Sequence, residues 1–304
     1  MLTRQIIDRV VRNALDEDAP WGDVTSELFI PAEATASARL IAREPGVFSG
    51  GEVLQRVMHA VDERIRVSSL LGDGKPFEAG QTIAQVEGPA RGILRGERVA
   101  LNLVQRMSGI ATLTAQYVAL TTGTRARIVD TRKTTPGLRA LERHAVVCGG
   151  GRNHRHSLSD AVMAKDNHLA VLTARGLSVT EAIRHVRSRL GHTTHVEVEV
   201  DRMDQIEPVL AGGVDTIMLD NFTVEQLRDG VALVAGRAIV EASGNVNLDT
   251  VAGIAATGVD VISVGALTHS VRSLDIGLDV EIAPALPEEL GAENLGPEDL
   301  GADR

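Results

Sequence analysis

Several kinds of residue are scarce in this sequence of 304 residues, and each scarcity excludes something. The single cysteine, Cys148, rules out an internal disulfide and a metal site built from several cysteines, and it suits a reducing compartment. Aromatic residues make up 2% of the chain and the formal net charge is -10. This composition argues against nucleic acid, which needs a basic face and stacking rings. No stretch approaches the roughly 18 uncharged apolar residues of a membrane span. We therefore expect a cytoplasmic protein without a nucleic-acid or membrane partner.

Lysine is also rare, because only Lys75, Lys133 and Lys165 occur among 31 basic residues. In a chain that otherwise uses arginine, Lys133 and Lys165 indicate positions that need a compact ammonium group, although chance placement is a competing explanation. Between residues 125 and 168, nine Arg or Lys stand against four Asp or Glu. This basic segment in an acidic chain predicts a cleft that holds a small, multiply anionic ligand.

The first third of the chain has the pattern of a small β-rich domain. Apolar residues at helical spacing predict a helix over 4–15. From about residue 35 to 95, short β-type runs alternate with glycine-rich turns. A second helix follows, and its polar edge carries the single charge of Arg98.

After residue 120 the pattern changes to strands that end in polar residues. These runs cover 126–130, 161–165, 195–200, 216–220, 238–243 and 261–265. Glu199, Asp220, Glu241 and Gly265 are separated by 21, 21 and 24 residues, with helix-like segments between them. Such spacing predicts a parallel α/β barrel with its site at the carboxyl ends of the strands, and an open doubly wound sheet is the alternative. The acidic segment 284–304, rich in Pro and Gly, predicts a disordered tail.

Cationic residues gather at two of these strand ends. Arg132 and Lys133 lie in DTRKTTPGLR, where an ion-paired surface turn is the alternative reading. Three glycines precede His154 and Arg155, and Lys165 ends the next strand. Glycines let the backbone approach an anion and offer N–H groups to it. The histidines could suggest zinc, but the neighbouring Arg and Lys side chains would repel a dication.

Acids and small residues complete the predicted site. Glu199 and Asp220 are hard oxygen ligands that suit Mg²⁺ with a substrate phosphate, or they pair with the cations opposite them. The segments EASGN and VGALTHS place Ser243, Gly244, Gly265 and Ala266 before the last two helices, where barrels often bind phosphate. Together these features match a phosphoribosyl diphosphate with Mg²⁺ and a carboxylated co-substrate.

The chain resembles the quinolinate phosphoribosyltransferase family from about residue 22 to 282. The matching motifs are GDVTS, ERVALNLVQRMSGIAT, DTRKTTPGLR, GGGRNHR, KDNH, EVEVD, IMLDN, EASGN and GVDVISVGALTHS. The resemblance implies a type II phosphoribosyltransferase-like α/β fold. An N-terminal β-rich α/β sandwich domain (1–108), joined by a returning segment (271–283), would precede an incomplete parallel α/β barrel (109–270). It also implies a homodimer, or a higher oligomer, in which Arg98 enters the partner's site.

The resemblance further implies transfer of phosphoribosyl from 5-phosphoribosyl 1-diphosphate to quinolinate with decarboxylation, giving nicotinate mononucleotide. Lys133, Lys165, Glu199 and Asp220 would be catalytic, and the two acids would hold Mg²⁺. The substrate-binding residues would be Arg98, Arg132, Lys133, His154, Arg155, Lys165, Glu199, Asp220, Ser243, Gly244, Asn245, Gly265 and Ala266. The chain departs from the family at His156-Ser157 and Arg143-His144, which bears on the shape of the pocket.

Three other functions fit parts of this pattern. A related phosphoribosyltransferase of the same fold would act on another base. A Schiff-base aldolase would use Lys165, although a lysine beside cations and Asp166 is not in an apolar pocket. A non-catalytic sensor would bind phosphoribosyl diphosphate without turnover.

Overall fold

The N-terminal unit is an antiparallel sheet covered by helices. The computed structural model describes residues 2–283, so the predicted tail over 284–304 lies outside the described residues. The sheet has the order β12-β1-β5-β3. Its strands are β1 (Thr35–Ala42), β3 (Arg66–Ser68), β5 (Thr82–Pro89) and β12 (Ile276–Ala283). Alternate residues of β1 are buried, so one face of the sheet packs on the helices and the other is exposed.

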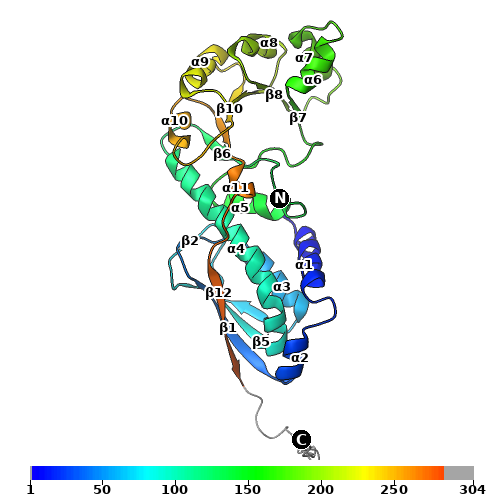
Figure 1. Cartoon of the computed structure of the whole chain (residues 1–304), viewed down its shortest axis with the longest axis vertical. Helices are drawn as coiled ribbons and strands as arrows, with labels where there is room; N and C mark the ends of the chain where they lie inside the picture. Colours follow the sequence, from blue (N-terminus) through cyan, green and yellow to red (C-terminus); the bar gives the residue numbers. More distant parts are fainter. Residues whose placement is uncertain (1, 284–304) are drawn as a thin grey trace, which may run out of the picture.

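Four helices and a two-stranded ribbon complete this unit (Figure 1). They are α1 (Arg4–Asp18), α2 (Val24–Phe29), α3 (Gly51–Val61), α4 (Ala90–Leu120), β2 (Gly46–Val47) and β4 (Pro76–Phe77). The helix expected over 4–15 is α1, which buries Ile7, Val10, Val11 and Leu15. Asp23 caps α2 by accepting the backbone N–H of Ser26.

Helix α4 connects the two units, because it continues for 31 residues from the first sheet to the second (Figure 1). Gly109 lets the segment before β12, at Arg272 and Ser273, approach the helix closely. A Cβ at this glycine would lie 2.2 Å from the carbonyl oxygen of Arg272. The division of the chain expected after residue 108 therefore falls inside a continuous helix.

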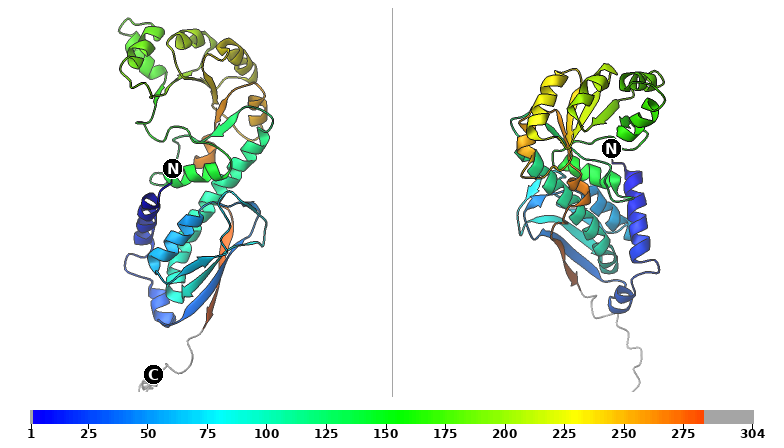
Figure 2. Two further views of the ribbon diagram at one scale, coloured as in Figure 1. Left: turned by 180° about the vertical axis from the view of Figure 1, so that it is seen from behind. Right: turned by 45° about the horizontal axis from the view of Figure 1, so that its top comes forward.

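The second unit is a parallel six-stranded sheet of order β6-β11-β10-β9-β8-β7. Its strands are β6 (Arg127–Val129), β7 (Val162–Ala164), β8 (Val196–Val200), β9 (Thr216–Asp220), β10 (Ile239–Ser243) and β11 (Val261–Ser263). Strands β6 and β7 end the order without pairing to each other, and the helices lie outside the curved sheet (Figure 2). The expected incomplete barrel is confirmed, and the open doubly wound sheet is not observed.

The helices of the second unit are short. They are α5 (Arg139–Cys148), α6 (Asp166–Thr173), α7 (Val179–Arg187), η1 (Met203–Gln205), α8 (Ile206–Ala211), α9 (Val224–Val234), α10 (Val251–Ala255) and α11 (Ala266–His269). Capping boxes begin α7 at Ser178 and α9 at Thr223. Within residues 2–283, none of the helices is both long and apolar enough to cross a membrane.

Candidate active site

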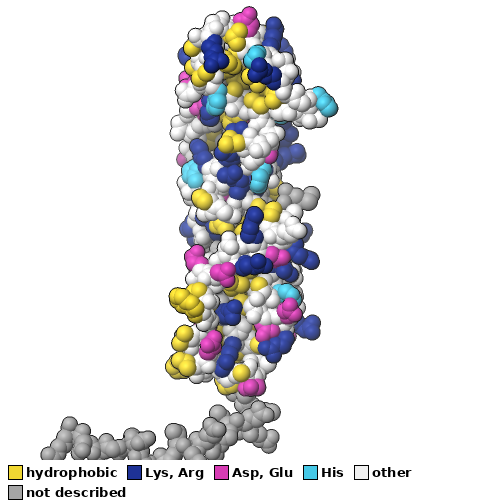
Figure 3. Space-filling view, turned by 90° about the vertical axis from the view of Figure 1, so that its right-hand side faces the viewer, with side chains coloured by type: hydrophobic (Ala, Val, Ile, Leu, Met, Phe, Trp, Pro, Cys, Tyr) yellow, Lys and Arg dark blue, Asp and Glu magenta, His cyan; other side chains and the backbone are white. Residues whose placement is uncertain are grey.

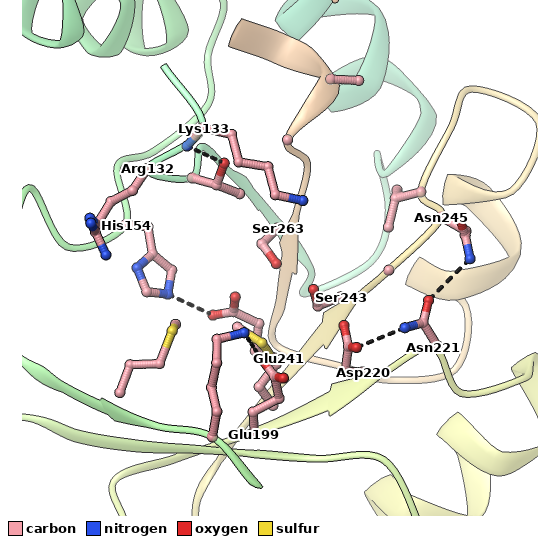
Figure 4. A pocket seen from close by; sticks show the side chains of 18 of the residues that line it. Arg132, Lys133, His154, Glu199, Asp220, Asn221, Glu241, Ser243, Asn245 and Ser263 are labelled. Carbon is pink, nitrogen blue, oxygen red and sulfur yellow. Dashed lines mark hydrogen bonds and ion pairs between the residues drawn. The ribbon is translucent and has the colours of Figure 1, made fainter. Parts of the chain in front are cut away.

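A pocket of about 780 Å³ lies at the carboxyl ends of the parallel strands, where the barrel pattern places it. Twelve of the thirteen predicted substrate-binding residues line it, and Arg98 is the exception. In Figure 4, Arg132, Lys133 and His154 lie on one side of the pocket, and Glu199, Glu241 and Asp220 lie on another. The pocket therefore offers both cations and carboxylates to a ligand. The pocket-lining residues that sequence reasoning did not select are Thr131, Met163, Met218, Asn221, Glu241, Val246, Ser263 and His269.

Two arginines form the most strongly cationic part of the wall. Burial, and then the nearby charge of Arg132, lower the pKa of Arg155. The Nε atom of Arg132 is buried and has no hydrogen-bond partner within residues 2–283. Two guanidinium groups that repel each other, one of them with an unused donor, are arranged for an anion. On the side of the molecule seen in Figure 3, Lys and Arg side chains occur along the whole length, and Asp and Glu side chains are more frequent in the lower half.

His154 is held by two buried carboxylates that the sequence analysis did not assign to the site. Its Nε2 lies 3.1 Å from Glu197 Oε2 and 3.5 Å from Glu241 Oε2. Burial opposes a charged imidazole, but the hydrogen bonds to Glu197 and Glu241 outweigh it and raise the pKa of His154 to about 10. The backbone nitrogen of Arg155 lies 2.7 Å from Nδ1, so Nε2 is the ring nitrogen that faces the two carboxylates.

A signal for these carboxylates was present in the sequence. Glu197 and Glu199 stand two residues apart in β8, so both side chains face the same side of the sheet. Glu241 sits in β10 at the position that the 21-residue spacing marks. The contact of these carboxylates with His154 could not be deduced, because His154 comes from a loop distant in sequence.

The loop that carries His154 and Arg155 is fixed by the buried Asp130. This carboxylate accepts the backbone N–H of His154 (2.8 Å) and the side-chain amide of Asn153 (2.7 Å). Arg143 reaches it from α5 (3.1 Å) and also donates to the carbonyl of His154 (2.7 Å). Burial raises the pKa of Asp130, although Arg143 opposes the shift. Arg143, one of the departures from the family pattern, thus supports the loop from below.

The two pocket lysines lie in different surroundings. The Nζ atom of Lys165 is 2.5 Å from Glu199 Oε2, across neighbouring strands β7 and β8. Lys133 passes over Gly265, where an added Cβ would lie 3.1 Å from Lys133 Cδ. The carbonyl of Lys133 accepts the Thr268 hydroxyl (2.7 Å), which ties this strand end to α11. A Schiff-base lysine typically lies in an apolar pocket, whereas Lys165 lies against a carboxylate, which disfavours the Schiff-base reading.

A polar nest follows β9 and β10. Asn221 donates to Asp220 Oδ2 (2.7 Å), and Asn245 donates to Asn221 Oδ1 (3.0 Å). Asn221, Gly244 and Asn245 all have positive φ, at 60°, 91° and 52°. Gly244 is required here, because a Cβ would lie 2.2 Å from Asn221 Oδ1. All three residues line the pocket, and backbone with positive φ of this kind is typical of loops that offer N–H groups to a phosphate.

Arg98 lies outside this pocket, on an exposed part of α4. Exposed apolar side chains occur near the start of the same helix. They belong to α2 and the turn before it: Trp21, Val24, Leu28 and Phe29 are 93%, 67%, 76% and 79% exposed. The side chain of Arg91 in α4 donates to the carbonyls of Glu27 and Ile30, which holds α2 against α4.

Comparisons with known proteins agree with this architecture. Residues 23–108 match the model of the quinolinate phosphoribosyl transferase N-terminal domain, and residues 110–279 match that of the C-terminal domain.

Named relatives and solved structures point the same way. The chain is 41% identical over 273 residues to a probable nicotinate-nucleotide pyrophosphorylase [carboxylating] of Bacillus subtilis (strain 168), covering 90% of this chain and 93% of the relative. It is 44% identical over 276 residues to the nicotinate-nucleotide pyrophosphorylase [carboxylating] of Mycobacterium leprae (strain TN), covering 89% and 95%. The structure of NadC from Streptococcus pyogenes superposes with a TM-score of 0.88 at 39% identity, covering 94% of this chain and 99% of that one. This chain belongs to the quinolinate phosphoribosyltransferase family.

Proposed function

We propose that this chain transfers the phosphoribosyl group of 5-phosphoribosyl 1-diphosphate to quinolinate, with release of pyrophosphate and carbon dioxide and formation of nicotinate mononucleotide. The observation that carries the proposal is the pocket itself. Cations, carboxylates and a backbone nest converge there at the ends of six parallel strands. These three features correspond to a dicarboxylate, a metal-bound diphosphate and a terminal phosphate. The reaction belongs to NAD biosynthesis, and the product is a pyridine nucleotide.

The cationic wall would hold the two carboxylates of quinolinate. Arg132 and Arg155 supply planar donors for bidentate pairs, which fix the plane of the pyridine ring. His154 adds positive charge to this wall, and Glu197 and Asp130 hold it in place through the ring and the backbone. An anionic ligand would relieve the repulsion between the two guanidinium groups, so binding uses a charge imbalance already present in the pocket.

Glu199 and Asp220 fit Mg²⁺. They are oxygen donors at the ends of adjacent strands β8 and β9, and Mg²⁺ typically takes one or two carboxylates together with substrate phosphates. When bound, Mg²⁺ would neutralise charge on the departing diphosphate. Lys133 would contact the same diphosphate, and Lys165 would leave Glu199 for a substrate carboxylate.

The loops after β10 and β11 would bind the ribose 5'-phosphate through backbone N–H groups. Their residues in the pocket are Ser243, Gly244, Asn245, Gly265 and Ala266. With both substrates held, the bond from the anomeric carbon to the pyrophosphate oxygen breaks and the ring nitrogen attacks that carbon. The pyridinium formed stabilises the electron pair that stays on the ring carbon when the adjacent carboxylate departs as carbon dioxide. That carbon then takes a proton from solvent, which gives nicotinate mononucleotide. The protein's part is positioning and electrostatics, because no covalent nucleophile is needed.

We also propose a homodimer in which Arg98 reaches the partner's pocket. The support is that Arg98 is exposed and outside its own pocket, on the helix that holds α2 through Arg91. Large exposed apolar side chains lie in α2 and the turn before it: Trp21, Val24, Leu28 and Phe29. Apolar side chains of this size on one surface mark an interface. A cytoplasmic location remains part of this proposal, and it rests on the single cysteine and the composition.

The test is to incubate the full chain with quinolinate, 5-phosphoribosyl 1-diphosphate and Mg²⁺, and to follow pyrophosphate and carbon dioxide together. We expect equal amounts of both products, and none when Mg²⁺ is chelated. Nicotinate replaces quinolinate in a parallel reaction, because it lacks the carboxylate that must leave. Turnover of nicotinate without quinolinate turnover would indicate a related enzyme for another base. Binding of both substrates without product would indicate a sensor.

A further inference from the structure

We propose that Asp73, His144 and Cys148 form a second metal site, selective for Zn²⁺ or a similar transition metal, at the junction of the two units. The observation is the convergence of three ligand types. One carboxylate oxygen, one imidazole nitrogen and the chain's single sulfur all lie within 4.8 Å of one another. The site is separate from the active-site pocket, which none of the three residues lines.

Helix geometry places two of the ligands. His144 and Cys148 are four residues apart in α5, so their side chains project from the same face of that helix. Asp73 comes from the turn between β3 and β4 in the N-terminal unit. The close packing of this turn on α5 is visible at Gly74, where an added Cβ would lie 3.2 Å from the carbonyl oxygen of Cys148.

The distances suit tetrahedral coordination after a small adjustment. Asp73 Oδ2 is 2.6 Å from His144 Nε2 and 3.8 Å from Cys148 Sγ. Around Zn²⁺, ligand oxygen and nitrogen lie about 3.4 Å apart, and oxygen and sulfur about 3.6 Å apart. The aspartate and histidine must therefore separate by roughly 0.8 Å to admit the ion. A water molecule would complete four ligands, because the His144 and Asp73 side chains keep 32% and 26% of their surface exposed.

Each side of the site has further support. The other oxygen of Asp73, Oδ1, accepts the backbone N–H groups of Gly50 (3.1 Å) and Gly51 (2.9 Å) at the start of α3, which leaves Oδ2 turned toward α5. The Ser49 hydroxyl donates to Cys148 Sγ (3.3 Å). Hydrogen bonds of this kind orient metal ligands and stabilise a thiolate. Sulfur and imidazole together favour Zn²⁺ over Mg²⁺, so the two metals would occupy different sites.

A metal ion at this site would connect the N-terminal unit to the helix that supports the active-site loop. The metal would link α3 and the turn at Asp73 to α5. The residue before His144 is Arg143, which donates to the carbonyls of His154 and Arg155. Metal binding at this junction would therefore stabilise the position of α5, and through Arg143 the loop that carries His154 and Arg155.

The experiment titrates Co²⁺, a spectroscopic substitute for Zn²⁺, into the reduced full chain with excess Mg²⁺ present to fill the active site. We expect one equivalent to bind with a thiolate-to-cobalt absorption band in the near ultraviolet and tetrahedral bands in the visible. Zn²⁺ should displace Co²⁺ and abolish these absorption bands. It should also slow the reaction of a thiol reagent with the protein by about tenfold or more. Because the chain has one cysteine, both signals report on Cys148.

Cys148→Ser and His144→Gln should each abolish the near-ultraviolet band or weaken binding by about tenfold or more. Glu199→Gln is the matched control and should keep the full spectrum. Circular dichroism checks that the variants fold, and the spectrum of the unchanged chain decides the question if they do not. Absence of the thiolate band, or equal Co²⁺ binding by Cys148→Ser, would overturn the site and leave Asp73 and His144 as an ion pair.

Discussion

At the scale of single residues, the pocket combines groups that destabilise one another without a ligand. Arg155 has a lowered pKa beside Arg132, and Arg132 keeps a buried donor unused. Glu197 and Glu241 each retain a buried oxygen without a hydrogen-bond partner in the described chain. Unsatisfied buried groups cost free energy, and they persist where function requires them. Substitution of these residues should therefore affect turnover more than stability.

The substitution Arg132→Ala should lower kcat/KM for quinolinate, because it removes a charge-assisted contact with a carboxylate in a desolvated pocket. A contact of that kind is worth about 2–5 kcal/mol, which corresponds to a loss of roughly 30- to 4,000-fold. Steady-state kinetics with quinolinate varied provide the measurement. Arg9→Ala, at an exposed position of α1, is the control and should change nothing. An unchanged kcat/KM for Arg132→Ala would remove this residue from the site.

Gly244→Ala tests the phosphate nest at one backbone position. Gly244 has φ of 91°, and an added Cβ would lie 2.2 Å from Asn221 Oδ1, so the loop must move. We expect KM for 5-phosphoribosyl 1-diphosphate to rise by about tenfold or more, since the loss of one or two phosphate contacts costs at least ~1.4 kcal/mol. Gly236→Ala is a matched control, because Gly236 also has positive φ but open space around its Cβ position. Equal kinetic effects of the two variants would argue against the nest.

At the scale of secondary-structure elements, the two ends of the barrel have different chemistry. The carboxyl ends of the strands form the pocket, and the amino ends carry acids that hold neighbouring elements together. Asp215, before β9, accepts the N–H of Val196 at the start of β8 (2.8 Å) and pairs with Arg187 at the end of α7 (2.9 Å). Asp260 accepts the N–H of Val240 at the start of β10 (2.9 Å) in the same manner.

Asp215→Asn should therefore reduce stability and not catalysis. Burial raises the pKa of Asp215, but Arg187 and the Val196 N–H outweigh it and lower that pKa below 3.8. A lowered folded-state pKa contributes stability that is present above the unfolded value and is lost as pH falls through the folded value. We expect a loss of about 1–2 kcal/mol at pH 7 that disappears in acid below that pKa. Urea unfolding across this pH range is the measurement, with exposed Asp229→Asn as the control. A loss that did not depend on pH would contradict the assigned charge.

The sequence pattern predicted the elements better than their long-range partners. Six strand runs, their polar ends and the βα spacing all correspond to β6 through β11, because hydrophobic periodicity is local information. The contact of His154 with Glu197 and Glu241 joins a loop to two strands, and no local pattern predicts it. The same holds for Asp73 with His144, which are 71 residues apart. Cys148 is a further case, because its neighbours Ser49 and Asp73 come from the other unit.

At the scale of the whole molecule, the proposed homodimer would bring Arg98 into a pocket, because this residue lies outside the pocket of its own chain. We expect Arg98→Ala and Lys133→Ala each to be nearly inactive alone. Mixing the two variants in equal amounts under subunit exchange should restore about a quarter of wild-type activity, because half of the random dimers contain one intact site of two. Activity that stayed at the level of the separate variants, with dimers demonstrated by light scattering, would place Arg98 outside the partner's pocket.

The pairing of β12 with β1 has a consequence for how the chain is made. Residues 276–283 form the outer strand against residues 35–42, although the entire six-stranded sheet lies between them in sequence. A nascent chain emerging from the ribosome therefore exposes the β1 edge until its last described strand has been synthesised. The first sheet can be completed only after the second unit has been synthesised. A translation arrest anywhere in the barrel would therefore leave the β1 edge unpaired and prone to aggregation.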